Sequence, residues 1–243
     1  MLDLKETIYK RKSIRKYKKE MLSDEEINEL LEFISSIKPL YEDIKVKFEI
    51  VEKEKVKSIF SWLSEQILVA YSEEKEGYNE NIGFIMQQID LYLQSKGIGS
   101  CWIGLGKADS AYIDNNDSKL KFVIMMTLGY PNEEFRKDIS EFKRNKLSEI
   151  SDLEDERLEV ARLAPSSINN QPWYFVHEEN KIHTYVARRN IFYKRAIENL
   201  LLIDTGIALA HIYVANKDNF KFYKEMEIKE IKGYNYLGSF TLD

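Results

Sequence analysis

The stretch APSSINNQPW, residues 164–173, is the least ordinary segment of the chain. Two prolines bracket a run of small polar side chains, and the strand-forming run Trp-Tyr-Phe-Val begins at its last residue. Such a loop has two interpretations. It is either a rigid connection between a helix and a strand, with serine hydroxyls that complete a turn, or one wall of a ligand site.

The composition is that of a soluble protein with one sizeable core. The 243 residues are 44% hydrophobic and 32% charged, the ordinary balance for a globular protein. The net charge of -5 disfavours a nucleic-acid partner, and the single cysteine excludes an internal disulfide or a zinc cluster. The N-terminus is too charged for a signal peptide, and the apolar run at residues 200–215 is too short and polar to span a bilayer. We expect a cytoplasmic protein without a membrane partner.

Hydrophobic periodicity predicts the main helices and strands. Ser23 should begin a helix, since Glu26 three residues later completes a capping box. Apolar residues recur at helical spacing in residues 79–96 and 193–216, which predicts two long helices. Shorter helices are expected at 4–11 and 155–163, a helix start at 56–63, and strands at 45–52, 67–71, 121–129, 173–177, 181–187 and 234–242.

These elements repeat one coarse plan. Helices and strands lead to a long apolar helix, and a strand follows it, in both halves of the chain. We expect the first half to cover residues 1–148 and the second half residues 149–243. The polar segment 133–149, of mixed charge, has the composition of a linker between them.

Two other segments have unusual compositions. RKSIRKY, residues 11–17, lies in a basic run, which is either a solvated loop or a cradle for an anion. GIGSCWIGLG, residues 97–106, has four glycines around a tryptophan and indicates close approach of the backbone to a flat group or to another backbone. It is not a phosphate loop of the GxGxxG type.

Together these segments resemble the nitroreductase family of FMN-dependent NAD(P)H oxidoreductases. RKSIRKY resembles the family's N-terminal RRSxRxY motif, PSSINNQPW resembles its PSSxNxQPW motif, and GIGSCWIG resembles its GLGTCWIGG stretch. Residues 128–131, Leu-Gly-Tyr-Pro, followed by Lys143 and Arg144, resemble the closing LGYP strand and its downstream basic pair. The resemblance covers nearly the whole chain. It implies an α+β, nitroreductase-like fold with mainly antiparallel sheets packed on long helices.

One motif is displaced relative to that family. In ordinary members the PSSxNxQPW loop lies soon after RRSxRxY and before the Trp-Gly stretch, whereas here SSIKPLY, residues 35–41, occupies that place. Ordinary members are homodimers in which one subunit supplies the phosphate-binding arginines and the other the PSS loop. The resemblance therefore implies a duplicated chain, an intrachain pseudo-dimer of the TM nitroreductase subgroup, in which two halves share one site.

The resemblance also implies roles in an FMN site. The residues expected at the phosphate and the ribityl edge are Arg11, Lys12, Ser13 and Arg15, joined by Lys143 or Arg144. The residues expected at or near the flavin ring are Ile103, Gly104, Leu105, Pro165, Ser166, Ser167, Asn169 and Gln171. The Asn169 amide suits the pyrimidine edge because it both donates and accepts. Backbone N–H groups of Gly104 and Leu105 should approach N5, and Arg15 or Lys12 should stabilise the charge that reduced flavin gains near N1.

The implied reaction passes a hydride from NAD(P)H through FMN to a small acceptor, a quinone or a nitroaromatic, in ping-pong order. It needs no side-chain nucleophile and no metal, and a monomer can perform it. Two alternatives stay open: an FMN carrier or sensor without NAD(P)H turnover, and an interaction protein that binds no flavin. We expect Cys101 to be a small buried residue, and the histidines to lie at a surface or interface without metal spacing: His177, His183 and His211.

Overall fold

The computed structural model describes residues 4–108, 119–188 and 195–242. The helices are α1 Lys5–Ile8, α2 Asp24–Ser36, α3 Tyr78–Ser95, α4 Leu147–Ile150, α5 Glu159–Arg162 and α6 Arg195–Ala215, with 3-10 turns η1 Lys53–Lys55, η3 Ile139–Glu141, η4 Glu156–Leu158 and η5 Ser167–Asn169. The strands are β1 Val46–Glu52, β2 Val56–Ser58, β3 Gln66–Glu73, β4 Gly99–Ile103, β5 Gly106–Ala108, β6 Leu120–Gly129, β7 Trp173–Glu178, β8 Lys181–Ala187, β9 Phe220–Tyr223 and β10 Tyr234–Leu242.

The two halves have the same topology. One sheet has the order β1-β3-β6-β4 and the other the order β7-β8-β10-β9, and all neighbouring strands in both are antiparallel. In each half the long helix, α3 or α6, follows the second strand of its sheet. The register of the central strand pair shifts in both sheets, between Ala70 and Tyr71 and between Tyr236 and Gly238. This repetition confirms the expected α+β fold with mainly antiparallel sheets on long helices.

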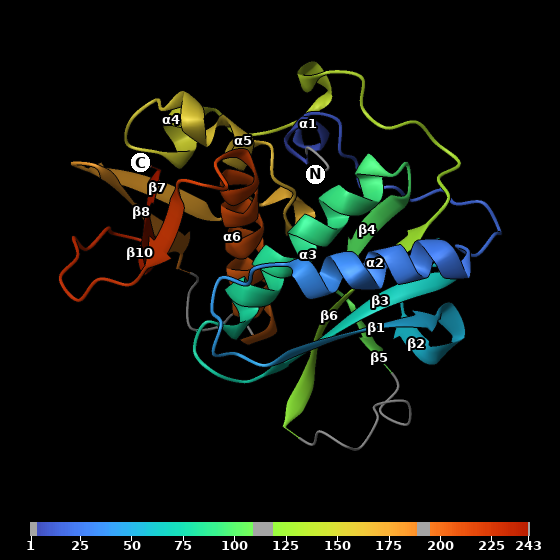
Figure 1. Ribbon diagram of the computed structural model, residues 1–243. Helices are drawn as coiled ribbons and strands as arrows, with labels where there is room; N and C mark the ends of the chain where they lie inside the picture. Colours follow the sequence, from blue (N-terminus) through green and yellow to red (C-terminus); the bar gives the residue numbers. More distant parts are fainter. Residues whose placement is uncertain (1–3, 109–118, 189–194, 243) are drawn as a thin grey trace.

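The long helices α3 and α6 pack against each other between the two sheets (Figure 1). Their crossing is reciprocal. A Cβ added at Gly83 would lie 2.2 Å from the Ile203 carbonyl oxygen, and one added at Gly206 would lie 2.1 Å from the Glu80 carbonyl oxygen. Each glycine thus faces the carbonyl three residues before the glycine of the other helix, as expected for two equivalent helices related by an approximate two-fold axis.

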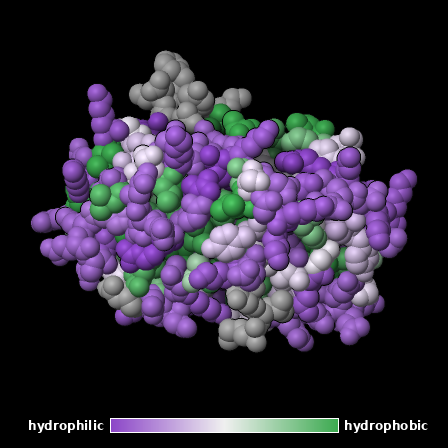
Figure 2. Space-filling view, turned by 90° about the horizontal axis from the view of Figure 1, so that it is seen from above, coloured by the Kyte–Doolittle hydropathy of each residue, from purple (hydrophilic) through white to green (hydrophobic). Residues whose placement is uncertain are grey.

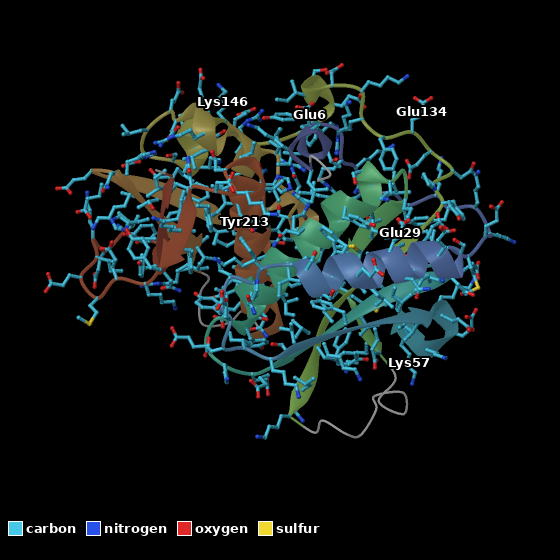
Figure 3. All side chains as sticks on the ribbon, in the orientation of Figure 1. Glu6, Glu29, Lys57, Glu134, Lys146 and Tyr213 are labelled. Atoms are coloured by element: carbon cyan, nitrogen blue, oxygen red, sulfur yellow. The ribbon has the colours of Figure 1, made fainter. Side chains whose placement is uncertain are left out.

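The halves share one hydrophobic core, to which both long helices and both sheets contribute. Figure 3 places Tyr213 of α6 inside the molecule, whereas Glu6, Glu134 and Lys146 lie toward its edge. The face seen in Figure 2 is mostly hydrophilic, with smaller hydrophobic areas. Helix α6 of the second half packs closely on α3 of the first, so the halves are not separate compact units. The boundary between residues 148 and 149 therefore stays a prediction.

Segment Ile197–Ala215 of α6 meets the length and composition expected of a membrane span, and 67% of it is buried inside the fold. Helix α6, Arg195–Ala215, lies within the range 193–216 expected for the second long helix. Of the helix expected from residue 193, residues 193 and 194 lie outside the described part of the chain.

Two expectations about connecting segments are wrong. Residues 56–63 do not begin a helix. Val56–Ser58 forms strand β2, which pairs with β5, and the rings of Phe60 and Trp62 lie 5.2 Å apart at a tilt of 36°. The segment 133–149 is more than a linker. Its Phe142 is buried and lies under the guanidinium groups of Arg136 and Arg144, which binds the segment to the core.

The capping box of α2 is present as expected. The Ser23 hydroxyl accepts from the Glu26 N–H at 3.3 Å, and the Glu26 carboxylate accepts from the Ser23 N–H at 2.8 Å. We expect Ser23→Ala to lower the free energy of unfolding by about 1 kcal/mol, measured by urea denaturation. Ser35→Ala is the matched control, since Ser35 lies exposed near the other end of the helix. Equal effects of the two variants would contradict the capping role.

Candidate functional site

A cavity of about 430 Å³ lies where both halves of the chain meet, within the usual range for small-molecule sites. Three of the four segments singled out in the sequence line it: Ser13 and Arg15 from the N-terminal motif, Gly104 and Leu105 after β4, and Pro165, Ser166 and Ser167 from the proline-bracketed loop. The other lining residues are Phe60, Trp62, Cys101, Trp102, Ile124, Ile168, Leu200, Ile203, Asp204 and Ile207. Flat aromatic and aliphatic walls therefore surround a few polar groups.

The N-terminal motif reaches the cavity because it runs beside β4. Ser13 forms a parallel bridge with Ser100, and the Ile14 N–H donates to the Ser100 carbonyl at 3.0 Å. Gly99 permits this approach, since a Cβ there would lie 2.9 Å from Ile14 Cγ2. Arg15 then extends along the wall, with its guanidinium carbon 5.5 Å from the centre of the Trp62 ring.

The proline-bracketed loop adopts a strained conformation. Ile168, Asn169 and Gln171 all have positive φ values, of 49°, 60° and 46°, a region that residues other than glycine rarely occupy. The Ser166 hydroxyl accepts from the Gln171 N–H at 2.9 Å, and the Asp204 carboxylate accepts from the Ser167 N–H at 3.0 Å. Strain of this kind persists where the surroundings over-determine the backbone, typically at ligand sites.

Asn169 and Gln171 hold this loop instead of lining the cavity. The Asn169 amide donates to the Lys143 carbonyl at 3.0 Å and accepts from Arg144 at 2.7 Å. The Gln171 side chain accepts from the Asn145 N–H at 2.8 Å. Both amides therefore bind the second-half loop to residues 143–145 near the end of the first half, and their expected contacts with a flavin ring stay a prediction.

The remaining predicted residues lie around the cavity without lining it. Arg11 is 1% exposed, pairs with the buried Asp90 at 2.9 Å, and donates to the Ser13 hydroxyl at 3.4 Å. Lys12 pairs with Glu133 at 2.7 Å. Ile103 is buried in a separate hydrophobic cluster under β3 and β6. Arg11 thus stands behind Ser13, and a direct contact of Arg11 or Lys12 with phosphate stays a prediction.

An electropositive group lies behind the loop. Arg144 donates to the Ala164 carbonyl at 3.0 Å, next to Pro165, and Arg136 donates to the Arg11 carbonyl. Burial, followed by repulsion from Arg11, lowers the pKa of Arg136 to about 10 and that of Arg144 to about 9. Neighbouring arginines that repel one another create a site at which an anion is favourable. Arg144, of the pair Lys143 and Arg144, is the one directed toward the loop.

Two of the histidines are not at the surface, and His211 lies between the halves, with its Nε2 atom 3.1 Å from Gln87 Nε2 of α3. His211 is fully buried and His183 is 2% exposed; burial lowers the pKa of His211 to about 3. The Nε2 atom of His183 lies 2.9 Å from the Glu178 carboxylate, and Glu225 completes a group with metal-binding geometry that the sequence spacing does not reveal. The Lys181 ammonium already pairs with both of these carboxylates. Cys101 is 2% exposed, as expected, and burial raises its pKa.

Asp204 lines the cavity although no motif in the sequence marks it as a site residue. It is 3% exposed on α6, and it lines the cavity while it holds the Ser167 N–H. Its signal in the sequence is an acidic residue within the long apolar run at residues 200–215. Such a residue also interrupts a potential membrane span, so the pattern alone does not assign it to a site. Phe60 and Trp62 also line the cavity, and they belong to no recognisable motif.

The family model described as "Putative TM nitroreductase" matches residues 3–216. A search of curated proteins gives no match. Among solved structures, a nitroreductase from Thermotoga maritima is 18% identical over 99% of this chain and 94% of its own, with a TM-score of 0.65. A nitroreductase family protein from Clostridium difficile is 15% identical over 64% of this chain and 99% of its own, with a TM-score of 0.50. These two likenesses support the fold, and the match of the family model over most of the chain means that this protein belongs to the TM nitroreductase family.

Proposed function

We propose that the chain is an FMN-dependent oxidoreductase of nitroreductase type that passes electrons from NAD(P)H to a small acceptor, a quinone or a nitroaromatic, in ping-pong order. The observation that carries the proposal is the convergence of three motif segments, distant in the sequence, on one cavity. Because two segments come from the first half and the third from the second half, a single chain, a pseudo-dimer, supplies one site.

The residues fit the proposed cofactor. Trp62, Trp102 and Pro165 present flat apolar surfaces suited to an aromatic ring system. Arg15 at the cavity wall and the Arg136–Arg144 group behind the loop provide cations for a phosphate. FMN, when bound, supplies the hydride chemistry, and the chain supplies binding and orientation.

The chain's own groups would perform three tasks. The strained loop, held by Asp204, Asn169 and Gln171, keeps Pro165 and Ser166 in one position against the cofactor. Apolar side chains from α6 exclude water from that side of the cavity, which strengthens electrostatic interactions inside it. Arg15 places a positive charge where negative charge develops during reduction.

We expect Arg15→Ala to weaken FMN binding about 10- to 100-fold, the loss of one charge-assisted hydrogen bond. FMN titration followed by flavin fluorescence measures this dissociation constant. Lys18→Ala is the matched control, because it removes the same charge from an exposed position outside the cavity lining. Equal weakening in both variants would mean that general electrostatic attraction, and not the cavity, binds the ligand.

Two further measurements separate the alternatives. Anaerobic bleaching of the bound flavin by NADH or NADPH supports the oxidoreductase, whereas a flavin-loaded protein that neither nucleotide reduces is a carrier or sensor. A protein that takes up no FMN is neither an oxidoreductase of this type nor a flavin carrier.

Size-exclusion chromatography with flavin absorbance tests whether a single chain forms the site. The single-chain site is wrong if only a dimer carries FMN.

A further inference from the structure

The internal repeat provides a comparison within one molecule for the role of Asp204. Helices α3 and α6 occupy equivalent places, and their crossing glycines face each other reciprocally. Asn81 lies two residues before Gly83, and Asp204 lies two residues before Gly206. Asn81 and Asp204 are therefore equivalent positions of the two halves.

Both side chains perform the same mechanical task. Asn81 Oδ1 accepts from the backbone N–H groups of Leu40 and Tyr41, at 2.9 Å and 3.0 Å. Asp204 accepts from the backbone N–H of Ser167 with both carboxylate oxygens, at 3.0 Å. In each half the held residues lie one or two positions after a proline, at 39 and at 165. A neutral amide is thus sufficient to hold such a loop.

A carboxyl group is a costly choice for this task. Asp204 is 3% exposed, and an ionised carboxylate loses most of its hydration on burial. Burial raises the pKa of Asp204 to about 7, although the Ser167 hydrogen bond opposes the shift. Other elements around this arrangement also carry ionisable residues. Arg15 and Cys101 line the same cavity, Glu80 contributes its backbone carbonyl to the helix crossing, and Arg144 donates to the Ala164 carbonyl in the loop. Among the described residues, none forms an ion pair with Asp204.

We propose that Asp204 is a proton donor to the acceptor bound in this cavity. The inference rests on the proposed function and adds a residue to it. Reduction of a quinone to a hydroquinone requires two electrons and two protons, and NAD(P)H supplies both electrons with one of the protons. The second proton leaves Asp204 as its O–H bond breaks and a new O–H bond forms on the acceptor. The carboxylate then regains a proton from water, so that one NAD(P)H, one proton and one quinone give NAD(P)+ and one hydroquinone.

Asp204→Asn tests this role while preserving the loop contact, since the amide of Asn81 makes that contact in the other half. We expect the rate of acceptor reduction to fall about 100-fold or more, as general acid catalysis is usually worth, while the FMN dissociation constant changes less than threefold. The wild-type rate should fall as pH rises through about 7, and the variant should lack this step. Asn81→Asp is the matched control and should leave the pH profile of acceptor reduction unchanged.

A readout independent of turnover is the thermal unfolding of the full chain without added FMN. Because the folded-state pKa of Asp204 is raised, the wild type should lose stability relative to Asp204→Asn as pH rises from 3.8 to about 7, with a constant difference above that. A pH-independent difference, or an unchanged rate of acceptor reduction in Asp204→Asn, would overturn the inference while the oxidoreductase stands. A protein that binds no FMN would overturn both.

Discussion

Arg11→Leu is expected to lower the free energy of unfolding by about 3 to 5 kcal/mol, because it leaves a buried carboxylate without its cation. Asp90 is fully buried and accepts from Arg11 Nε at 2.9 Å. It also accepts from Gln87 and Gln94, both at 2.9 Å. These neutral donors satisfy its oxygens but do not neutralise its charge. Urea denaturation monitored by circular dichroism measures the loss.

Asp90→Asn in the Arg11→Leu background is the informative companion variant. Removing the carboxylate charge should restore part of the lost stability, which a double-mutant cycle measures directly. Loss of less than about 1 kcal/mol in Arg11→Leu would contradict a dominant role for the pair. The variant is also relevant to the FMN proposal. Weaker flavin binding in an Arg11 variant has two sources: loss of the hydrogen bond from Arg11 to the Ser13 hydroxyl, and loss of a direct contact between Arg11 and the phosphate.

Gly206→Ala is expected to cost about 3 kcal/mol, although alanine favours a helix over glycine by about 1 kcal/mol. The new Cβ would lie 2.1 Å from the Glu80 carbonyl oxygen, so the two central helices must separate. Gly83→Ala should have a similar effect through the Ile203 carbonyl. The double variant should cost less than the sum, because a single separation of the helices relieves both contacts.

Glu198→Ala is the control for the helix crossing. It adds the same alanine at an exposed position of α6, and it should change the unfolding free energy by less than about 0.5 kcal/mol. Equal stability of Gly206→Ala and Glu198→Ala would contradict the close backbone approach. Fully additive effects of the two glycine variants would mean that they act at independent sites.

Local elements were predictable because their causes are local. The capping box at Ser23 and the periodicity of residues 79–96 depend on neighbours within a few positions, and both expectations are confirmed. The β7–β8 hairpin follows from alternation on both sides of a short turn. The prediction of a helix near residue 59 is wrong, because apolar residues at helical spacing are also compatible with a short strand, here paired with β5, and the loop that follows it.

The sequence motifs predicted which residues line the cavity. They did not predict which motif residues, such as Asn169, instead hold the loop in place. Ser13, Gly104 and Pro165, which the resemblance placed in an FMN site, line the cavity, and their contact with FMN stays a prediction. Asn169 belongs to the same motif, but its amide is directed to Lys143 and Arg144. A motif specifies residue types at a spacing, and the direction of each side chain depends on partners that lie elsewhere in the chain.

The sequence by itself determined the two long helices and the unusual loop at residues 164–173, because periodicity and short-range chemistry depend on neighbouring residues. The α+β class followed from the resemblance of its motifs to a known family. Only the tertiary structure decided that Arg11 is buried against Asp90 and that Asp204 faces the cavity with Asn81 as its equivalent. These facts depend on which surfaces of α3 and α6 meet. The contact between the two helices depends on close packing around Gly83 and Gly206. These glycines are more than 100 residues apart in the sequence, so no local sequence pattern predicts the contact.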